Sequence, residues 1–317
     1  MDISVIIPLY NEVDSLPELH QWITRVMEGN HFTYEIILID DGSKDGSWTW
    51  IENMASQDVR VKGVRFRRNY GKSAALHTGF EESKGDVVIT MDADLQDSPD
   101  EIPGLYKMVR EQGFDLVSGW KKKRFDPITK TVPSKLYNAT ASYVTGIKLH
   151  DFNCGLKAYR QDVVKSIEVY GEMHRYIPYM AKQAGFSKIG EIPIQHQARK
   201  YGVTKFGLSR FIFGYLDLMS ISFISRFGKR PMHLFGTLGS LMFVFGFFAV
   251  TWLGGYKVYN LAHGILIERI TQSPYFYLAL TSMILGTQLF LAGFLGELIS
   301  RSAAERNQYL IDKKVNI

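Results

Sequence analysis

Short apolar runs alternate with amphipathic stretches along the first part of the chain. The apolar runs predict strands at residues 4–9, 35–40, 61–66, 86–91 and 114–118. The stretches between them predict helices near residues 15–28, 46–56, 72–84 and 100–112. Runs rich in Val and Ile that are separated by helices are typical of a mostly parallel sheet covered on both faces. The sequence therefore predicts an α/β domain whose ligands bind at the carboxyl ends of the strands.

Two later stretches, residues 231–256 and 270–296, contain no Asp, Glu, Lys or Arg. About 20 helical residues cross a hydrocarbon core of about 30 Å, so each stretch is long enough to span a membrane. A pair of buried core helices is the alternative. Basic residues lie before the first stretch and after the second, namely Arg226, Lys229, Arg230, Arg301, Arg306, Lys313 and Lys314. Because cytoplasmic flanks are rich in Lys and Arg, both termini are expected in the cytoplasm.

This pattern divides the chain into four parts. Residues 1–206 form the cytosolic α/β domain, and residues 231–299 form a transmembrane hairpin. Residues 207–230 lie between them. Their first part, residues 207–225, is apolar with few charges, which favours helices lying in the membrane interface over an ordinary core helix. Residues 300–317 are expected to be a cytosolic basic tail. The sequence thus predicts a multi-pass membrane protein.

Composition narrows the class further. Apolar residues make up 46% and charged residues 22%, which excludes a disordered chain, a collagen-like fibre and a disulfide scaffold. The single cysteine, Cys154, cannot form an internal disulfide, which indicates a reducing compartment. The net charge of +5 suggests contact with phosphate or membrane.

Acidic residues follow several of the predicted strands. Asp92, Ala93 and Asp94 come directly after the fourth strand. Two carboxylates so close repel each other unless a cation lies between them, and oxygen ligands suit Mg²⁺ or Mn²⁺. Because Mg²⁺ binds through one or two carboxylates and substrate phosphates, a diphosphate partner is implied. Solvated loop carboxylates are the alternative.

The first two strands also end in polar residues. Asn11 and Glu12 follow the first strand, and Asp40, Asp41 and Ser43 end the second. A carboxylate here can accept a hydrogen bond from a ribose hydroxyl or a base N–H, although a turn with a helix cap explains these residues equally well. The first strand is not followed by G-x-G-x-x-G, so a dinucleotide site is poorly supported.

Basic residues that could complete a diphosphate site occur at 121–124 and 199–205. Arginine binds phosphate through two hydrogen bonds, whereas lysine acts as a point charge. The alternatives are a solvated face and attraction to anionic lipid. Neither Ser-His-Asp order, zinc-ligand spacing nor a P-loop is evident, and His174 and His196 are expected to be structural.

Five motifs stand in a recognisable order. They are Pro8-Leu9-Tyr10-Asn11-Glu12, Asp40-Asp41-Gly42-Ser43-Lys44-Asp45, Asn69-Tyr70-Gly71-Lys72, Asp92-Ala93-Asp94-Leu95-Gln96-Asp97 and Asp151-Phe152-Asn153-Cys154-Gly155-Leu156-Lys157. In this combination the chain resembles the family 2 inverting glycosyltransferases of the GT-A fold. Within that family it resembles the polyprenyl-phosphate glycosyltransferases, such as dolichol-phosphate mannose synthase and the bacterial bactoprenol glucosyltransferases. The resemblance covers essentially the whole chain.

The resemblance assigns roles to individual positions. The donor-binding set would be Pro8, Tyr10, Asn11, Glu12, Asp40, Asp41, Ser43, Lys72, Asp92 and Ala93. Asp92, Asp94 and Gln96 would surround the metal, and Asp151 with Asp94 would be catalytic. The phosphate-binding set would be Lys121, Arg124, Lys130, Ser134, Arg199 and Lys205. Two arginines common in the family are replaced, one by the Trp120-Lys121 context and one, upstream of Ser134, by Lys130.

The resemblance also implies a reaction. A sugar, with glucose from UDP-glucose expected first, would move to undecaprenyl or dolichyl phosphate with the help of Mg²⁺ or Mn²⁺. GDP-mannose, a UDP-N-acetylhexosamine and an aminopentose donor remain open. The expected partners are a nucleotide sugar, the polyprenyl phosphate, membrane lipid and copies of the same chain, as a homo-oligomer such as a tetramer, but no nucleic acid. The bacterial inner membrane is the expected location.

Two other functions remain open. A processive polysaccharide synthase shares the nucleotide-binding motifs, but its Q-x-x-R-W motif is not found, and the stretch from Gln195 to Lys200 does not match it. A membrane-tethered sensor of nucleotide sugars could retain Asp41 without needing the metal pair or Asp151, all of which are present.

Overall fold

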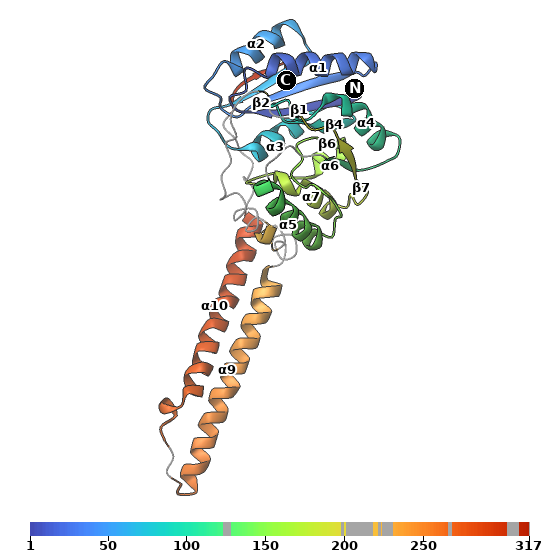
Figure 1. Cartoon of the computed structure of the whole chain (residues 1–317). Coiled ribbons are helices and arrows are strands. Elements are labelled where there is room, and N and C mark those ends of the chain that lie inside the picture. The colour runs from blue at the N-terminus through green and yellow to red at the C-terminus, as the bar shows by residue number, and fades with distance from the viewer. Residues whose placement is uncertain are drawn as a thin grey trace. The chain divides into compact units, whose positions relative to one another are not determined.

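A computed structural model of the chain contains two compact units (Figure 1). The first unit is Met1–Ile221 with Asn307–Ile317, and the second is Ser222–Arg306. The structure describes residues 1–122, 128–197, 200, 218–220, 223, 231–265, 268–302 and 311–316.

One mixed sheet forms the centre of the first unit. In sequence order its strands are β1 (Ile3–Leu9), β2 (Tyr34–Asp40), β3 (Val61–Phe66), β4 (Val87–Thr90), β5 (Leu116–Lys121), β6 (Lys157–Arg160), β7 (Ile189–Ile194) and β8 (Ile311–Val315). Their order across the eight-stranded sheet is β7-β5-β6-β4-β1-β2-β3-β8. All five strands predicted from the sequence are present, and the predicted α/β class with a mostly parallel sheet is confirmed.

Strand direction determines which loops meet at the functional edge of the sheet. Strand β1 pairs in parallel with β2 and β4, and β2 pairs in parallel with β3. Strand β6 lies between β4 and β5 and is antiparallel to both. The start of β6 therefore lies at the edge where β4 and β5 end, and Lys157 is in register with both Thr90 and Ser118.

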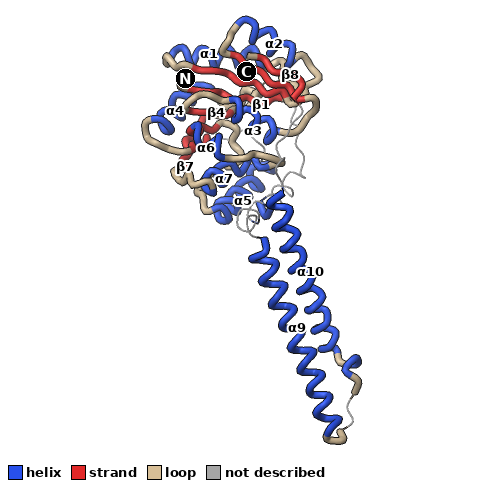
Figure 2. The backbone as a smooth tube through the Cα atoms, turned by 180° about the vertical axis from the view of Figure 1, so that it is seen from behind, coloured by secondary structure: helices blue, strands red, loops and turns tan. Residues whose placement is uncertain are grey.

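Helices cover both faces of the sheet, as Figures 1 and 2 show. They are α1 (Leu16–Gly29), α2 (Ser47–Gln57), α3 (Lys72–Glu82), α4 (Ile102–Arg110), α5 (Ile128–Thr145), α6 (Gln161–Ser166) and α7 (Ile177–Gln183), with short 3₁₀ helices η1 (Pro99–Glu101) and η2 (Met173–Tyr176). Alternate side chains of β1 enter different cores. Val5 and Ile7 pack in the cluster that includes α1, α2 and α4, and Ile6 packs in the cluster that includes α3, α6 and α7. A sheet buried on both faces explains why its strands read as continuous apolar runs.

A third buried cluster fixes helix α5. Tyr137 and Ala141 of α5 pack with Leu149 and Phe152, which precede β6, and with Tyr176 of η2. Burial of these apolar groups anchors α5 against the loop that enters β6.

The second unit is a helical hairpin. Helix α9 (Pro231–Ala262) and helix α10 (Pro274–Ser302) are both long and apolar enough to span a membrane, and η3 (Ile270–Gln272) precedes α10. Only 17% of the most apolar window of each helix is buried, which is unlike a core helix of a soluble protein. The sequence predicted these two spans, and the helices are present where it placed them.

Glycines let the two helices of the hairpin approach closely. A Cβ added at Gly239 would lie 2.5 Å from the carbonyl oxygen of Gly286, and one added at Gly246 would lie 2.5 Å from that of Ala279. Membrane helices pack through such small residues, because apolar side chains gain nothing by leaving lipid for each other.

The end of the chain returns to the sheet of the first unit. Strand β8 is antiparallel to β3, and Lys313 Nζ lies 3.3 Å from Glu52 Oε1 of α2. Asn316 Nδ2 donates to the carbonyl oxygens of Ala55, at 2.9 Å, and Val61, at 3.2 Å. The sequence predicts a basic tail here, whereas the structure forms an edge strand from residues 311–315. The predicted interfacial segment 207–230 lies outside the described residues, apart from 218–220 and 223.

Candidate functional site

The loops after β1 and β2 are bonded to each other. Asn11 has a φ of 54°, its N–H donates to Ser43 Oγ at 2.8 Å, and its Oδ1 accepts from the N–H of Lys44 at 2.8 Å. Asp40 Oδ1 accepts from the N–H of Ser43 at 2.8 Å. Asn11, Asp40 and Ser43, all predicted to bind the donor, therefore build one framework at the carboxyl edge of the sheet.

Asp41 connects this framework to helix α3. Its two carboxylate oxygens accept from the N–H groups of Tyr70, at 2.6 Å, and Gly71, at 2.9 Å. Gly71 has a φ of 93°, which suits glycine, and Lys72 follows it as the first residue of α3. Burial raises the pKa of Asp41 to about 6 despite the two backbone hydrogen bonds, which lower it. Asp41 thus has the turn-forming role, and its contact with a donor remains a prediction.

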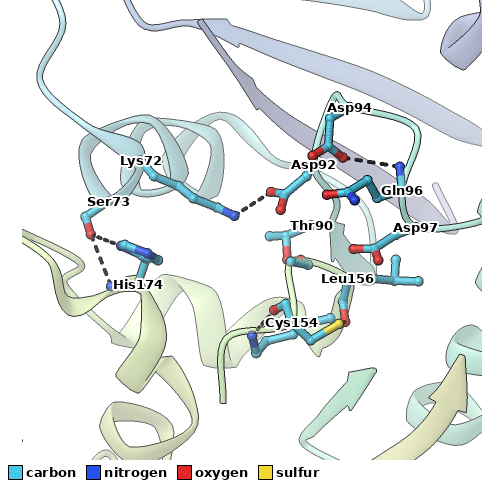
Figure 3. Close-up of polar contacts among 12 residues, drawn as sticks. Lys72, Ser73, Thr90, Asp92, Asp94, Gln96, Asp97, Cys154, Leu156 and His174 are labelled. Carbon is cyan, nitrogen blue, oxygen red and sulfur yellow. Dashed lines mark hydrogen bonds and ion pairs between the residues drawn. The ribbon is translucent and has the colours of Figure 1, made fainter. Parts of the chain in front are cut away.

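The turn after β4 brings the predicted metal ligands together, as Figure 3 shows. Asp94 is buried, its Oδ1 accepts from the N–H of Gln96 at 3.2 Å, and the intervening Leu95 has a φ of 61°. The half-buried carboxylate of Asp92 forms a short ion pair with Lys72 Nζ. Burial raises the pKa of Asp92, but the ammonium of Lys72, with smaller effects of Lys121 and Lys157, more than offsets this, and the pKa falls to about 2.

These residues fit part of a metal site. Among the described residues, no group of three His, Cys, Asp or Glu side chains is arranged to hold a metal on its own. Asp92 and Asp94 supply carboxylates from a single turn, which is the number that Mg²⁺ takes when substrate phosphates provide other ligands. The structure is therefore compatible with a cation that binds together with a diphosphate.

Lys121 pairs with a buried carboxylate instead of pointing into solvent. Its Nζ lies 2.9 Å from Asp97 Oδ1, and Asp97 is 1% exposed. Burial would lower the pKa of Lys121, but Asp97 raises it above its ordinary value. His196 Nδ1 lies 3.7 Å from the same oxygen, and its structural role stays a prediction. The predicted contact of Lys121 with a phosphate has to compete with this ion pair.

The loop before β6 places Asp151 at the same edge as Asp92. Asp151 is buried, and one carboxylate oxygen accepts from the N–H of Asn153 at 3.0 Å. A Cβ added at Gly155 would lie 2.5 Å from Asp92 Oδ2, and Thr90 Oγ1 donates to the carbonyl oxygen of Gly155 at 2.9 Å. The positions predicted to be catalytic and to bind the metal thus lie on loops in direct contact.

Three residues beside these loops, Lys157, Ser73 and His174, were not predicted as site residues. Lys157 is buried, and its Nζ donates to the carbonyl oxygens of Phe152, at 3.2 Å, and Cys154. Burial lowers the pKa of Lys157. Ser73 Oγ and His174 Nδ1 lie 3.1 Å apart, joining the start of α3 to η2 (Figure 3). Lys157 is the last residue of the fifth sequence motif. The sequence does not show that its side chain enters the loop, because this depends on the antiparallel direction of β6.

Some of the remaining predicted positions lie at the edge of the sheet, and the others lie wholly or partly outside the described residues. Pro8 lies in β1, Tyr10 follows it, Ala93 is buried in the turn after β4, and the N–H of Glu12 donates to Ser47 Oγ at 3.2 Å. Lys130 and Ser134 belong to α5, although their side chains lie outside the described part. Arg124, Arg199 and Lys205 also lie outside the described residues.

Solved structures share this fold. Glucosyl-3-phosphoglycerate synthase from Mycobacterium tuberculosis, in complex with phosphoglyceric acid, gives a TM-score of 0.55 at 18% identity, over 71% of this chain and 79% of that chain. The same enzyme with Mn²⁺, UDP-glucose and phosphoglyceric acid gives a TM-score of 0.53 at 17% identity, over 71% and 79%. Mannosyl-3-phosphoglycerate synthase from Rubrobacter xylanophilus gives 0.56 at 17% identity, over 71% and 75%.

Curated relatives match nearly the whole chain. Dodecaprenyl-phosphate galacturonate synthase of Rhizobium johnstonii is 33% identical over 305 residues, which cover 95% of this chain and 88% of that protein. Undecaprenyl-phosphate 4-deoxy-4-formamido-L-arabinose transferase of Aeromonas hydrophila is 34% identical over 318 residues, covering 99% and 94%. The profile named Glycosyl transferase family 2 matches residues 4–168. The chain therefore belongs to glycosyl transferase family 2.

Proposed function

We propose that this protein transfers a sugar from a nucleoside diphosphate sugar to a polyprenyl phosphate in the membrane. The main support is the meeting of Asp92, Asp94 and the Asp151 loop at one edge of the sheet, in a chain with two helices long enough to span a membrane. The names of two full-length relatives, both polyprenyl-phosphate sugar enzymes, support the same acceptor.

The chemistry needs little proton transfer. The second pKa of a phosphate monoester is near 6, so the acceptor is mostly a dianion at pH 7. Its oxygen attacks the anomeric carbon and forms the new C–O bond, while the bond from that carbon to the diphosphate breaks and the nucleoside diphosphate leaves. In-line attack inverts the anomeric configuration, so an α-linked donor gives a β-linked product.

The protein must mainly manage charge and orientation. Asp92, Asp94 and Gln96 would hold Mg²⁺ or Mn²⁺, which supplies charge neutralisation for the departing diphosphate. Glucosyl-3-phosphoglycerate synthase, a structural neighbour solved in complex with Mn²⁺ and UDP-glucose, supports a divalent ion of this kind. Asp151 orients groups at the reacting centre, because a dianionic acceptor does not require a strong base.

The donor sugar is the least constrained part of the proposal. The sequence favours UDP-glucose, but the names of the two relatives give galacturonate and 4-deoxy-4-formamido-L-arabinose. The test is a panel of UDP-glucose, UDP-galacturonate and UDP-4-deoxy-4-formamido-L-arabinose, each with undecaprenyl phosphate and Mg²⁺ or Mn²⁺. Mass spectrometry of the lipid fraction identifies the sugar, and NMR of the product gives its anomeric configuration. Formation of free sugar alone, with no sugar on the lipid for any donor of the panel, would contradict the proposal.

The return of the chain to the sheet supports a specific topology. Because β8 pairs with β3, residues 311–315 belong on the same side of the membrane as the α/β unit. The chain must therefore cross the membrane an even number of times between the α/β unit and residues 311–315, as it would with two spanning helices. We propose cytoplasmic termini with residues 263–269 on the far side, in the bacterial inner membrane. A cysteine at Lys313 should then resist an impermeant thiol reagent in intact cells, and a cysteine at His263 should react.

Assembly into a homo-oligomer stays a prediction from the resemblance. The molar mass of the purified protein–detergent complex, corrected for detergent, tests it directly.

A further inference from the structure

We propose that Asn138 of helix α5 is a positioning residue that holds Asp151 in place. The inference rests on the proposed function, since it takes Asp151 to act at the reacting centre. It identifies a residue that lies outside every motif found in the sequence.

The side chain of Asn138 is bonded to the backbone on both sides of Asp151. Its Nδ2 donates to the carbonyl oxygen of His150 at 3.0 Å, and its Oδ1 accepts from the N–H of Phe152 at 3.3 Å. Asn138 is 6% exposed, so little water competes for these bonds. The two partners also fix the orientation of the amide, because the carbonyl requires a donor and the N–H requires an acceptor.

The two hydrogen bonds from Asn138 form a bracket around Asp151, and this bracket constrains the backbone that carries the aspartate. With residues 150 and 152 both tied to one amide, the peptide units on either side of Asp151 cannot rotate independently. The amide thus replaces a neighbouring strand, which would make the same pair of bonds to alternate residues.

The other contacts of the loop hold residues on one side of Asp151 or the other. Glu191 of β7 accepts from the N–H of His150 at 2.8 Å, and the ring of His150 stacks on Trp120 with centroids 4.1 Å apart. Lys157 fills the inside of the loop through the carbonyl oxygens of Phe152 and Cys154. The side chain of Asn138, in contrast, bonds to the backbone on both sides of Asp151.

Buried packing holds the part of helix α5 that carries Asn138. Tyr137 and Ala141 flank Asn138 on the buried side of the helix and pack with Phe152. Ser134, a predicted phosphate-binding position, lies one turn before Asn138 in the same helix. Helix α5 therefore carries both Asn138 and a position predicted to bind phosphate.

The test compares Asn138→Ala with Ser142→Ala in the full-length protein. Ser142 lies one turn further along α5, and its Oγ donates to the carbonyl oxygen of Leu149, outside the bracket, at 3.2 Å. With undecaprenyl phosphate and the best donor of the panel, N138A should lower kcat about 10- to 100-fold, because small misplacements of reacting groups cost this much. The KM of the donor and the affinity for UDP with Mn²⁺ should stay within about twofold, since the bracket does not touch the nucleotide loops. S142A should keep wild-type turnover.

A double-mutant cycle with Asp151→Asn separates positioning from a general structural role. If Asn138 acts through Asp151, adding N138A to D151N should slow turnover little further. Multiplication of the two losses would overturn the inference, as would wild-type turnover in N138A. Wild-type turnover in D151N alone would instead overturn the proposed role of Asp151.

The near-isosteric Asn138→Asp covers the case in which N138A folds poorly. It keeps the acceptor for the N–H of Phe152 and loses the donor to His150, so we expect slow turnover with normal binding of UDP. Loss of UDP binding in both variants would make Asn138 a residue of the fold and would overturn the inference.

Discussion

The two units use the same residue type, glycine, for different purposes. In the α/β unit, Gly155 allows a loop to lie against the carboxylate of Asp92. In the hairpin, Gly239 and Gly246 allow one helix backbone to lie against another. The α/β unit gains its stability from apolar side chains buried on both faces of the sheet, and the hairpin leaves its apolar side chains outside. Close approach thus shapes a polar site in the first unit and holds helices together in the second.

The largest expected effect comes from removing a carboxylate of the α/β unit that is proposed to bind the metal. Asp94→Ala should reduce turnover by about 10³-fold or more, because charge stabilisation of the leaving group carries most of the catalysis. Asp86→Ala is a matched control, since Asp86 lies before β4, at the opposite edge, in an exposed pair with Arg110. Initial rates of both variants, with circular dichroism to confirm folding, check the prediction. Near-normal turnover of D94A would remove the metal assignment.

A smaller loss is expected when the close approach at Gly155 is prevented. Gly155→Ala would push a methyl group into the carboxylate of Asp92, so we expect turnover to fall about 100-fold. Mn²⁺-dependent binding of UDP, measured by calorimetry, should weaken with it. Gly29→Ala is the control, because a Cβ at the end of α1 meets nothing within 4 Å. Unchanged metal-dependent binding in G155A would show that the contact does not position Asp92.

In the hairpin the same kind of change should affect stability more than chemistry. Gly246→Leu should separate α9 from α10 and destabilise their packing by about 1–3 kcal/mol, the usual cost of overpacking. Gly254→Leu is the control in the same helix, since nothing lies within 4 Å of an added Cβ there. Thermal unfolding in one detergent compares the two variants. Equal midpoints would contradict the packing described for the hairpin, and a large loss of kcat at full stability would break the separation of roles between the units.

The smallest effect concerns pH and Asp41. Burial holds the pKa of Asp41 at about 6, so the folded protein binds this proton more tightly than the unfolded chain does. Asp41 therefore disfavours folding above pH 6, and this penalty disappears as the pH falls toward 4. If the ionised carboxylate contacts the donor, binding of a UDP-sugar should weaken about tenfold between pH 7 and pH 5. Titration calorimetry with UDP-glucose, which lacks a phosphate ionisation near pH 6, measures this. The same weakening in Asp41→Asn would assign it to another group.

Local pattern was sufficient to predict much of the molecule. The strands β1 to β5 and the two long helices follow from apolar runs of different lengths. The carboxyl-edge residues Asn11, Asp41 and Asp92 follow from their places after strands. The antiparallel strands β6 and β8 could not be predicted, because their direction depends on pairing with segments far away in the sequence. For the same reason, nothing in the sequence around Asn138 signals its bonds to residues 150 and 152.

Pairing between elements also determines what two of the predicted site residues contact. Lys72 and Lys121 are near the predicted site, but each is paired with an aspartate, Asp92 and Asp97 respectively. The sequence shows only that such cations exist. Their partners depend on which loops the sheet brings together.

Release of UDP from a UDP-sugar, measured with and without undecaprenyl phosphate, tests the central claim most directly. We predict release that depends on the lipid phosphate, on Mg²⁺ or Mn²⁺, and on Asp94, with an equal amount of sugar recovered in the lipid. Nucleotide binding without lipid-dependent release, for every donor of the panel, would contradict the account and favour a sensor of nucleotide sugars.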